Sequence, residues 1–488
     1  MPPEINSGDT AWMLAAAALV MFMTPGLGFF YAGFTRSKNV LGTIMQSFIV
    51  VGLVGVLWVL IGYTLAFGPT EGGIIGNLSF IGFKDVGIIP DDKAVVGNVT
   101  WGPTIPHEAF AIFQAMFAII TPALITGAFA ERAKFSTFLI FMAAWSLLVY
   151  APVAHWIFGA GWLGIADSGG INALDFAGGA AIHVNAGAAA LAAALLYGRR
   201  KGFGREPMEP HNVTYIVLGA AILWFGWFGF NAGSAGAASG QAANAFVVTN
   251  TAAASAALSW MFASWALTGK ASVIGAAAGA VAGLVAITPA SGFVQPWAAI
   301  VIGSVAGVVC YLVVRVRERS GVDDSLDVVA VHGVGGTWGA LATGLFATAA
   351  VSGLADNEGL FYGHPAQVLD QLAAIATVWI YSFAVTAIIL KVLDLTLGLR
   401  VTEDEEELGL DVTQHGERGY VLDEGAGLAV VQYAEGPPPA PTSAPRVQPE
   451  SAGSGTIAAV WMSRHASAAC AFGSATSAPG SRRTPITW

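Results

Sequence analysis

The chain has 488 residues, of which 55% are hydrophobic and only 11% are charged, and its formal net charge is −10. Soluble proteins carry about 25% charged residues, so this composition excludes an ordinary soluble domain and indicates a polytopic membrane protein. Part of the negative charge lies in the acidic block from Glu403 to Glu407, so the net charge says little about the apolar part. We expect membrane lipid around the chain and no nucleic-acid partner.

Eleven apolar segments are long enough to cross about 30 Å of hydrocarbon. Each is expected to be a helix, because the bilayer offers no partner for exposed backbone groups. The predicted fold class is therefore an all-α polytopic membrane protein with 11 transmembrane helices. These helices are predicted over about residues 10–34, 40–67, 110–130, 135–158, 176–198, 213–231, 244–267, 272–289, 294–315, 331–351 and 368–398.

The charged residues of the loops predict the orientation. Lys and Arg cluster in alternate loops, which are expected to face the cytoplasm. These residues are Arg36, Lys38, Arg132, Lys134, Arg199, Arg200, Lys201, Arg205, Lys270, Arg315, Arg317 and Arg319. The pattern places the N-terminus outside and the C-terminus inside. No Lys or Arg precedes the first apolar segment, so it lacks the basic region of a cleavable signal peptide and is expected to remain.

Two pairs of short motifs recur five helices apart. Asp175 precedes His183 by eight residues in the fifth helix, and Asp324 precedes His332 by eight residues at the tenth. The second pair is FFYAG, residues 29–33, and FGFNAG, residues 228–233. An odd number of helices repeated once must insert with opposite topology, so we predict an inverted repeat of helices 1–5 and 6–10, followed by an eleventh helix.

Ionisable groups inside apolar helices usually line a path or a cavity. His183 and His332 are such groups, and two neutral imidazoles that face one lumen can pass a proton between their ring nitrogens. The alternative is that each histidine only satisfies a hydrogen bond between packed helices. A metal site is not expected, because no carboxylate or cysteine cluster accompanies the histidines and the two cysteines are Cys310 and Cys470.

Carboxylates stand at the starts of the two histidine helices. Asp175 is placed to cap the fifth helix by accepting a hydrogen bond from the N–H of Ala177 or Gly178. The other interpretation is that the same carboxylate sets the potential of an outer cation site without touching the ion. Asp324 and Asp327 lie at the corresponding start of the tenth helix, where capping is the stronger interpretation.

Aromatic residues stand near the outer ends of helices in both halves. They are FQAMF, residues 113–117, and WFGF, residues 227–230, which is followed by Ser234. Such rings often form interfacial belts or pack helices together. Their faces also bind small cations by roughly 0.5–2 kcal/mol each. A nearby hydroxyl adds an acceptor, so the combination favours a cation that donates hydrogen bonds, as ammonium does and potassium does not.

Six longer blocks resemble the motifs of the ammonium transporter (Amt) family. They are MTPGLGFFYAGF (23–34), FQAMFAIITPALITGAFAERAKF (113–135), DFAGGAAIHVNAG (175–187), GWFGFNAGSAG (226–236), AGLVAITPASG (282–292) and VDDSLDVVAVHGVGG (322–336). The resemblance covers roughly residues 5–420. It implies an inverted five-helix repeat with an eleventh helix, one pore in each protomer, and a homotrimer.

The resemblance also implies roles for individual residues. The outer ammonium site is expected to contain Phe117, Trp227 and Ser234, with the carboxylate of Asp175 supporting recognition. The chain departs from the family at Phe158, where many members have a tryptophan.

Deeper in the protein, the resemblance implies an aromatic gate and a pore. The gate is expected to consist of Phe117 and Phe230. The pore is expected to contain the paired histidines His183 and His332 together with Thr288.

The chain is expected to divide into a membrane domain (1–400), a cytoplasmic C-terminal regulatory segment (401–435) and a disordered low-complexity tail (436–488). In the family, the C-terminal segment folds against the inner face and touches the neighbouring protomer. In many members it accompanies control by a trimeric PII-type nitrogen-sensing protein, so such a regulator is an expected partner. The Pro-rich tail matches nothing in the family pattern.

The expected function is that of an ammonium/ammonia permease of the cytoplasmic membrane, with no enzymatic activity and no cofactor. The sequence has no GxxxxGK[ST] phosphate loop, so ATP is not expected to drive it. Removing water from NH4+ is unfavourable in an apolar pore, so the predicted route is recruitment of the cation, loss of a proton and conduction of ammonia, with or without the proton. Two other interpretations stay open: a sensor with a vestigial pore, and a membrane-embedded enzyme that uses the histidines as general bases.

Overall fold

The computed structural model describes residues 4–88, 95–96, 99–100, 103–164, 170–353 and 358–420. They belong to one structural unit, Met1–Leu422. The predicted low-complexity tail and residues 421–435 of the predicted regulatory segment lie outside the described residues.

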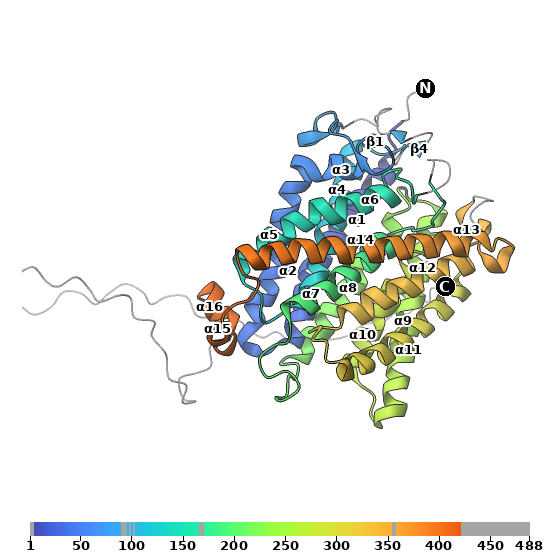
Figure 1. The fold of residues 1–488 in the computed structure, drawn as a ribbon. Helices are drawn as coiled ribbons and strands as arrows, with labels where there is room; N and C mark the ends of the chain where they lie inside the picture. The colour runs from blue at the N-terminus through green and yellow to red at the C-terminus, as the bar shows by residue number, and fades with distance from the viewer. Residues whose placement is uncertain are drawn as a thin grey trace, which may run out of the picture. The chain divides into compact units, whose positions relative to one another are not determined.

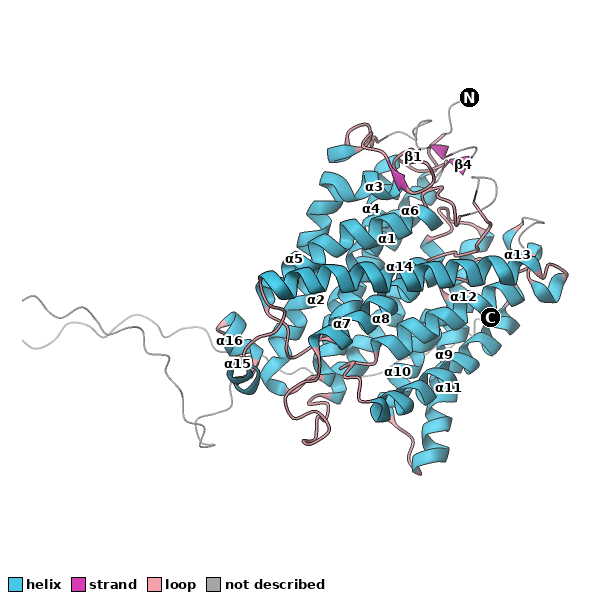
Figure 2. Cartoon of the chain, in the orientation of Figure 1, coloured by secondary structure: helices cyan, strands magenta, loops and turns pink. Residues whose placement is uncertain are grey.

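The described part is almost entirely helical (Figures 1 and 2), as the composition predicted. The first elements are α1 (Ser7–Phe34), η1 (Ser37–Asn39), α2 (Val40–Leu57), η2 (Trp58–Gly62), α3 (Tyr63–Phe67), η3 (Ile81–Phe83), α4 (His107–Ile125), η4 (Thr126–Ala128), α5 (Phe135–Trp145), η5 (Ser146–Tyr150), α6 (Ala151–Ile157), η7 (Gly179–Val184) and α7 (Asn185–Tyr197). The later elements are α8 (Val213–Gly233), α9 (Gly240–Thr268), α10 (Val273–Ile287), α11 (Pro296–Ser320), η8 (Val329–Val334), α12 (Gly335–Phe346), α13 (Ala349–Ser352), η9 (Leu360–Tyr362), α14 (Ala366–Thr396), α15 (Glu403–Leu408) and α16 (Leu410–His415). Two short antiparallel hairpins pair β1 (Thr70–Glu71) with β2 (Ile75–Gly76) and β3 (Val95–Val96) with β4 (Val99–Thr100).

Nine helical spans within the described residues are long and apolar enough to cross a membrane. They include continuous runs such as Ser37–Phe67 and Phe135–Ile157. The other two predicted segments are also helical, as α10 and as η8 with α12, but they are shorter. This is the architecture of a multi-pass helical membrane protein, whereas eleven crossings, the inverted repeat and the orientation of the termini stay predictions.

Helices α1 and α8 pack closely because glycines remove side chains from their contact. A Cβ added at Gly226 would lie 2.2 Å from Cγ of Met23, and one at Gly219 would lie 2.3 Å from the backbone nitrogen of Phe30. Real Cβ atoms do not approach so closely. The glycines therefore hold the aromatic residues of α8 at a fixed depth against α1.

Small residues also join α9 to α10 and α11. A Cβ at Gly283 of α10 or at Gly303 of α11 would lie 2.4 Å or 2.2 Å from the carbonyl oxygen of Ala252. These two glycines belong to series spaced by four residues, as is common where membrane helices approach one another. On another side of the bundle, the long helix α14 runs across α5, α7 and α12 (Figure 1).

The C-terminal helix α16 packs against η1 and α2, and α15 is held to η1 by Nζ of Lys38, which donates to the carbonyl of Glu406 at 2.9 Å. The amide of Leu410 donates to Oδ1 of Asn39, and the amide of Gly42 donates to Oδ1 of Asp411, both at 2.8 Å. Thr402 caps α15 and exchanges hydrogen bonds with the third residue of that helix. Residues 401–420 therefore form a layer at one end of the bundle. The loop from Arg199 to Arg205 lies at the same end, where the amide of Lys201 donates to Glu406.

Candidate functional site

The two predicted histidines lie on short stretches of π-helix. η7 carries His183 and continues into α7, and η8 carries His332 and continues into α12. A π-helix forms i→i+5 hydrogen bonds and is frequent at functional sites. The helices begin at Gly179 and Val329, so the predicted starts at about residues 176 and 331 are corrected by a few residues.

Asp175 explains where η7 begins. Its two carboxylate oxygens accept hydrogen bonds from the backbone amides of residues 178–181 at 2.6–3.0 Å. The first amides of a helix have no partner inside the helix, and here the carboxylate of one side chain accepts hydrogen bonds from four of them. Asp324 acts similarly at η8, where Oδ2 accepts from the amide of Val329 at 2.8 Å. Both carboxylates are therefore helix caps.

The side chains of His183 and His332 face each other inside the protein. Their Nδ1 atoms lie 3.2 Å apart and their ring centroids 5.2 Å apart. In a pair of neutral imidazoles, one Nδ1 must donate and the other must accept. The ring that donates through Nδ1 then has an unprotonated Nε2, whereas the other ring carries its proton on Nε2. The pair thus offers one acceptor and one donor to a small polar molecule.

The second ring nitrogen of His183, Nε2, has no hydrogen-bond partner among the described residues. His183 is only 1% exposed. A buried polar atom without a partner is unfavourable by about 1–3 kcal/mol, so native proteins keep few of them. This atom therefore marks a place for a small hydrogen-bonding ligand.

Trp227 forms one wall beside the histidine pair. Its ring stacks on His183 with a centroid separation of 5.4 Å and an interplanar angle of 26°. The indole N–H donates to the hydroxyl of Thr288 at 2.8 Å, and that hydroxyl donates to the carbonyl of Leu284 at 2.7 Å. Thr288 therefore holds the indole in place from behind.

Phe117 and Phe230 are in direct contact. Their centroids are 4.5 Å apart at an interplanar angle of 52°, and both rings are buried. Phe230 also lies parallel to the ring of His183, with centroids 6.0 Å apart and an interplanar angle of 16°. The rings of Phe117, Phe230 and His183 therefore follow one another in this order.

A cavity of about 400 Å³ lies on one side of the Phe117 and Phe230 rings. We call it the outer cavity, after the side of the membrane predicted for the N-terminus. Its walls include Phe117, Phe158 and Ser234. The hydroxyl of Ser234 donates to the carbonyl of Phe230 at 2.9 Å, so its oxygen lone pairs are available to accept.

On the other side of the rings lies a central cavity with a volume of only about 10 Å³. Its walls include Phe30, Trp227 and Phe230 together with the two histidines. This volume is near the minimum for one water-sized molecule. The central cavity is therefore too small for a hydrated ion.

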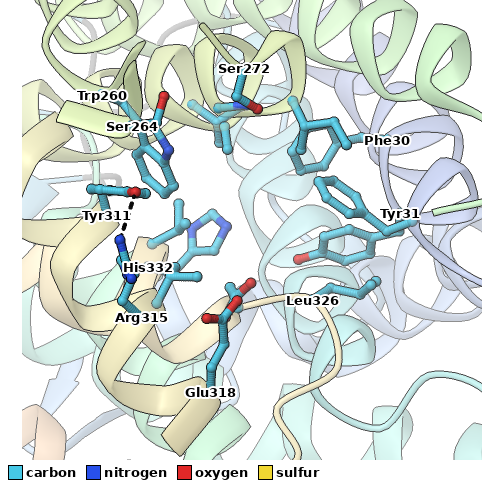
Figure 3. Close-up of a pocket in the computed structure, with 18 of the residues that line it drawn as sticks. Phe30, Tyr31, Trp260, Ser264, Ser272, Tyr311, Arg315, Glu318, Leu326 and His332 are labelled. Atoms are coloured by element: carbon cyan, nitrogen blue, oxygen red, sulfur yellow. Dashed lines mark hydrogen bonds between the residues drawn. The ribbon is translucent and has the colours of Figure 1, made fainter. Parts of the chain in front are cut away.

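A third cavity, of about 530 Å³, shares His332 with the central one, and we call it the inner cavity. Figure 3 shows His332 between Phe30 and Tyr31 on one side and Trp260 and Tyr311 on the other. The three cavities therefore follow one another through the bundle and are separated by aromatic rings and imidazoles.

The inner cavity also contains charged groups. Nε of Arg317 donates to Oδ1 of Asp327 at 2.8 Å, and Glu318 and Arg315 lie in the same cavity wall as Asp327. Burial raises the pKa of Asp327 to about 7, although the charge of Arg317 opposes this. Among the described residues, no group of three or more His, Cys, Asp or Glu is arranged to hold a metal ion.

The structure corrects the predicted membership of the outer site. Trp227 and Ser234 are seven residues apart on α8, which separates them by about 10 Å along the helix axis. Trp227 accordingly borders the central cavity and Ser234 the outer one. Phe158, rather than Trp227, accompanies Phe117 and Ser234 in the outer cavity.

Two further residues of the predicted site lie outside the three cavities. Asp175 does not line the outer cavity, although the next two residues do, because its oxygens face the amides of η7. Thr288 lines none of the three cavities, because it lies behind Trp227. Phe30, which borders both the central and the inner cavity, was missed. Its place in the repeated FFYAG motif was the available signal.

Comparisons with known proteins identify relatives of the whole described unit. A sequence profile described as Ammonium Transporter Family matches residues 11–420. The ammonium transporter of Bacillus subtilis is 49% identical over 417 residues, which cover 85% of this chain and 99% of that protein. The crystal structure of Candida albicans Mep2 matches with a TM-score of 0.76 and 38% identity, over 82% of this chain and 88% of that chain. A solved structure named Sensor Amt Protein matches with a TM-score of 0.74 and 29% identity, over 84% of this chain and 98% of that chain.

Proposed function

Because this chain belongs to the ammonium transporter family, we propose that it carries ammonium across a membrane through the three cavities described above. The same membership confirms the family predicted from the sequence motifs. In this proposal the protein acts as a transporter and not as an enzyme, in agreement with its relative in Bacillus subtilis, which is named an ammonium transporter.

The proposed path begins in the outer cavity. Ammonium binds there against the rings of Phe117 and Phe158 and donates a hydrogen bond to the hydroxyl of Ser234. Aromatic faces attract a cation by roughly 0.5–2 kcal/mol each, more where water is excluded. Potassium gains the aromatic attraction but has no hydrogen to donate, so the site distinguishes the two ions.

The next step is passage between Phe117 and Phe230. Their contact leaves no room for bulk water, and the central cavity beyond admits only a molecule of about the size of water. A bare cation in this apolar space would lose its hydration, which is strongly unfavourable. Ammonium therefore transfers a proton to solvent water at the outer cavity and moves on as neutral NH3, and NH3 takes up a proton from solvent water in or beyond the inner cavity. The proton passes with it or separately.

The observation that carries this proposal is the unpartnered Nε2 of His183 in the smallest of the cavities. Ammonia has three N–H donors and one lone pair, so it complements a pair of imidazoles that presents one acceptor and one donor. A hydrated ion fits neither the size nor the hydrogen-bonding pattern. The geometry therefore favours conduction of ammonia past the two histidines.

Substitution of the histidines tests this role. His183→Ala and His332→Ala each remove a polar group from the central cavity and enlarge it, so we expect purified variants that remain assembled but admit potassium or lose ammonium uptake. The measurement is uptake of both ions into proteoliposomes. If both variants transport ammonium and reject potassium as the parent does, the proposed role of the histidines is wrong.

We further propose a homotrimer in the cell membrane, with the C-terminal segment on the cytoplasmic side available to a PII-type regulator. The ordered packing of α15 and α16 against η1 and α2 supports a role for this segment at one face of the bundle. A sensor is the second candidate, because one similar structure carries that name. The transporter of Bacillus subtilis is the closer in sequence of the two, at 49% against 29% identity, so transport is preferred.

A further inference from the structure

Asp9 is a charged residue outside the series of aromatic rings and histidines described above. It lies in the first turn of α1, is 9% exposed and lines the outer cavity. Among the described residues of this cavity wall it is the only one with a charged side chain. Several phenylalanine rings, including Phe113 and Phe117, surround the same space.

The carboxylate of Asp9 accepts two hydrogen bonds, and the N-terminus of α1 supplies only a partial positive charge beside it. Oδ2 accepts from the hydroxyl of Thr104 at 2.6 Å, and Oδ1 accepts from the amide of Ala238 at 2.9 Å. Neither donor carries a charge, and no Lys, Arg or His forms an ion pair with Asp9 within the described ranges. A carboxylate held in a partly desolvated cavity without a positive partner attracts cations from solution.

Asp175 differs in this respect. Its oxygens accept hydrogen bonds from four amides at the positive end of η7, and it does not line the cavity. The carboxylate that faces the outer cavity is therefore Asp9. It stands on a different helix from the one that the sequence indicated.

We propose that Asp9 is the residue that recruits the cation electrostatically to the outer cavity, acting on ammonium before it reaches Phe117 and Ser234. This inference rests on the proposed transport function. It assigns Asp9 to the capture of the ion and not to its passage past the histidines. Removal of the charge should therefore change the ammonium concentration needed for uptake and leave the maximal rate unchanged.

The test is Asp9→Asn, which retains the shape of the side chain, an acceptor for the Ala238 amide and a donor for Thr104. Uptake into proteoliposomes is measured against ammonium concentration at low and at physiological ionic strength. We expect the half-saturating concentration to rise about ten-fold at low ionic strength, with the dependence on salt strongly reduced. The matched control is Glu108→Gln, which removes an exposed charge from the first turn of α4 that does not line the cavity. It should behave like the parent.

A rescue variant separates recruitment from a structural role. Ala237 lines the same cavity, so Asp9→Asn combined with Ala237→Asp should restore the lower half-saturating concentration. If Asp9→Asn fails to assemble, Ala237→Asp alone should lower the half-saturating concentration of the parent. A parent-like concentration and salt dependence in Asp9→Asn would overturn the inference, and so would an assembled Ala237→Asp variant that has no effect in either background.

Calorimetric titration of the purified protein with ammonium distinguishes this inference from the proposed function. Tighter ammonium binding by the parent than by Asp9→Asn supports recruitment even if the parent does not transport. Equal binding by both overturns it. Absence of uptake by the parent contradicts the proposed function instead.

Discussion

Phe230 performs two tasks with one ring. It contacts Phe117 on the side of the outer cavity and lies parallel to His183 on the side of the central cavity. Its exposed fraction is zero, and helix α8 holds it in place through close glycine contacts with α1. Under the proposed function, one side chain therefore both closes the path to water and borders the space beside the histidines.

Truncation of this ring should abolish selective transport. Phe230→Ala removes the contact with Phe117 and joins the outer and central cavities, so we expect either a leak to potassium or loss of ammonium uptake. The matched control is Phe228→Ala, two residues earlier on α8, whose ring stacks on Phe246 at a centroid distance of 3.9 Å. Parent-like flux and selectivity in Phe230→Ala would show that this ring only fills space.

A substitution of Phe158 should strengthen ammonium binding, whereas the truncation of Phe230 should abolish selective transport. An indole face attracts cations more strongly than a phenyl face, and a whole cation–π contact at an exposed site is about 0.5–1 kcal/mol, which sets the upper bound of the gain. Phe158→Trp should therefore lower the half-saturating ammonium concentration by up to about five-fold. Phe225→Trp, at an exposed position of α8, serves as the control. An unchanged concentration in Phe158→Trp would mean that the ion does not contact this ring.

At the scale of elements, the carboxylate of Glu406 is one of several groups that join the C-terminal segment to the bundle. Oε1 of Glu406 accepts from the amide of Lys201 at 2.6 Å, and Oε2 accepts from Arg400 at 2.6 Å. Next to Lys201, the side chain of Arg200 pairs with the buried Asp323 at 2.8 Å, just before the cap of η8. The segment is therefore linked through one loop to the helix that carries the second histidine.

Removal of this segment should affect uptake. A stop after Arg400 deletes Glu406 together with α15 and α16, so the loop at Lys201 loses its partner and we expect lower uptake. A stop after Tyr420 retains every described contact of the segment and should leave uptake unchanged. Uptake and native mass spectrometry of both truncations provide the measurement. Equal loss of function in both would assign a role to the residues beyond 420.

The buried pair of Arg200 and Asp323 stabilises the same region. Burial by itself raises the pKa of Asp323, but the hydrogen bonds and charge of Arg200 outweigh it, and the pKa is lowered. Its stabilising contribution is therefore complete above the unfolded-state pKa of about 3.9 and is lost as the pH falls through the lower folded-state pKa.

Asp323→Asn should destabilise the protein at neutral pH by up to about 3–5 kcal/mol, because it leaves the buried charge of Arg200 with only the more distant carboxylate of Glu131, at 3.8 Å. Thermal unfolding in detergent measures this effect, with Asp394→Asn as the control because Asp394 is an exposed residue of α14. Equal unfolding temperatures for the two variants would show that the buried pair contributes no more than a surface pair.

At the scale of the whole molecule, hydropathy predicted the helices and the repeated spacing predicted that His183 and His332 meet, although they are 149 residues apart. The π-helices were not predictable, because no residue pattern in the sequence distinguishes i→i+5 from i→i+4 hydrogen bonds. Trp227 was grouped with Ser234 in the outer site, because the sequence gives the order of residues along the chain but not the cavity that each side chain borders. Asp9 was missed because its partners lie 95 and 229 residues away, so its sequence neighbourhood shows only an acid in a helix's first turn.

The central claim is that the whole path selects ammonium by binding it as a cation and passing it as ammonia. The most direct test is ammonium-evoked uptake, recorded together with current, in proteoliposomes that contain the purified parent protein, with potassium at equal concentration as the comparison and protein-free liposomes as the blank. The account predicts saturable ammonium uptake with no potassium flux, and the current reports whether the proton accompanies the ammonia. Absence of ammonium uptake, or potassium flux equal to that of ammonium, would contradict it.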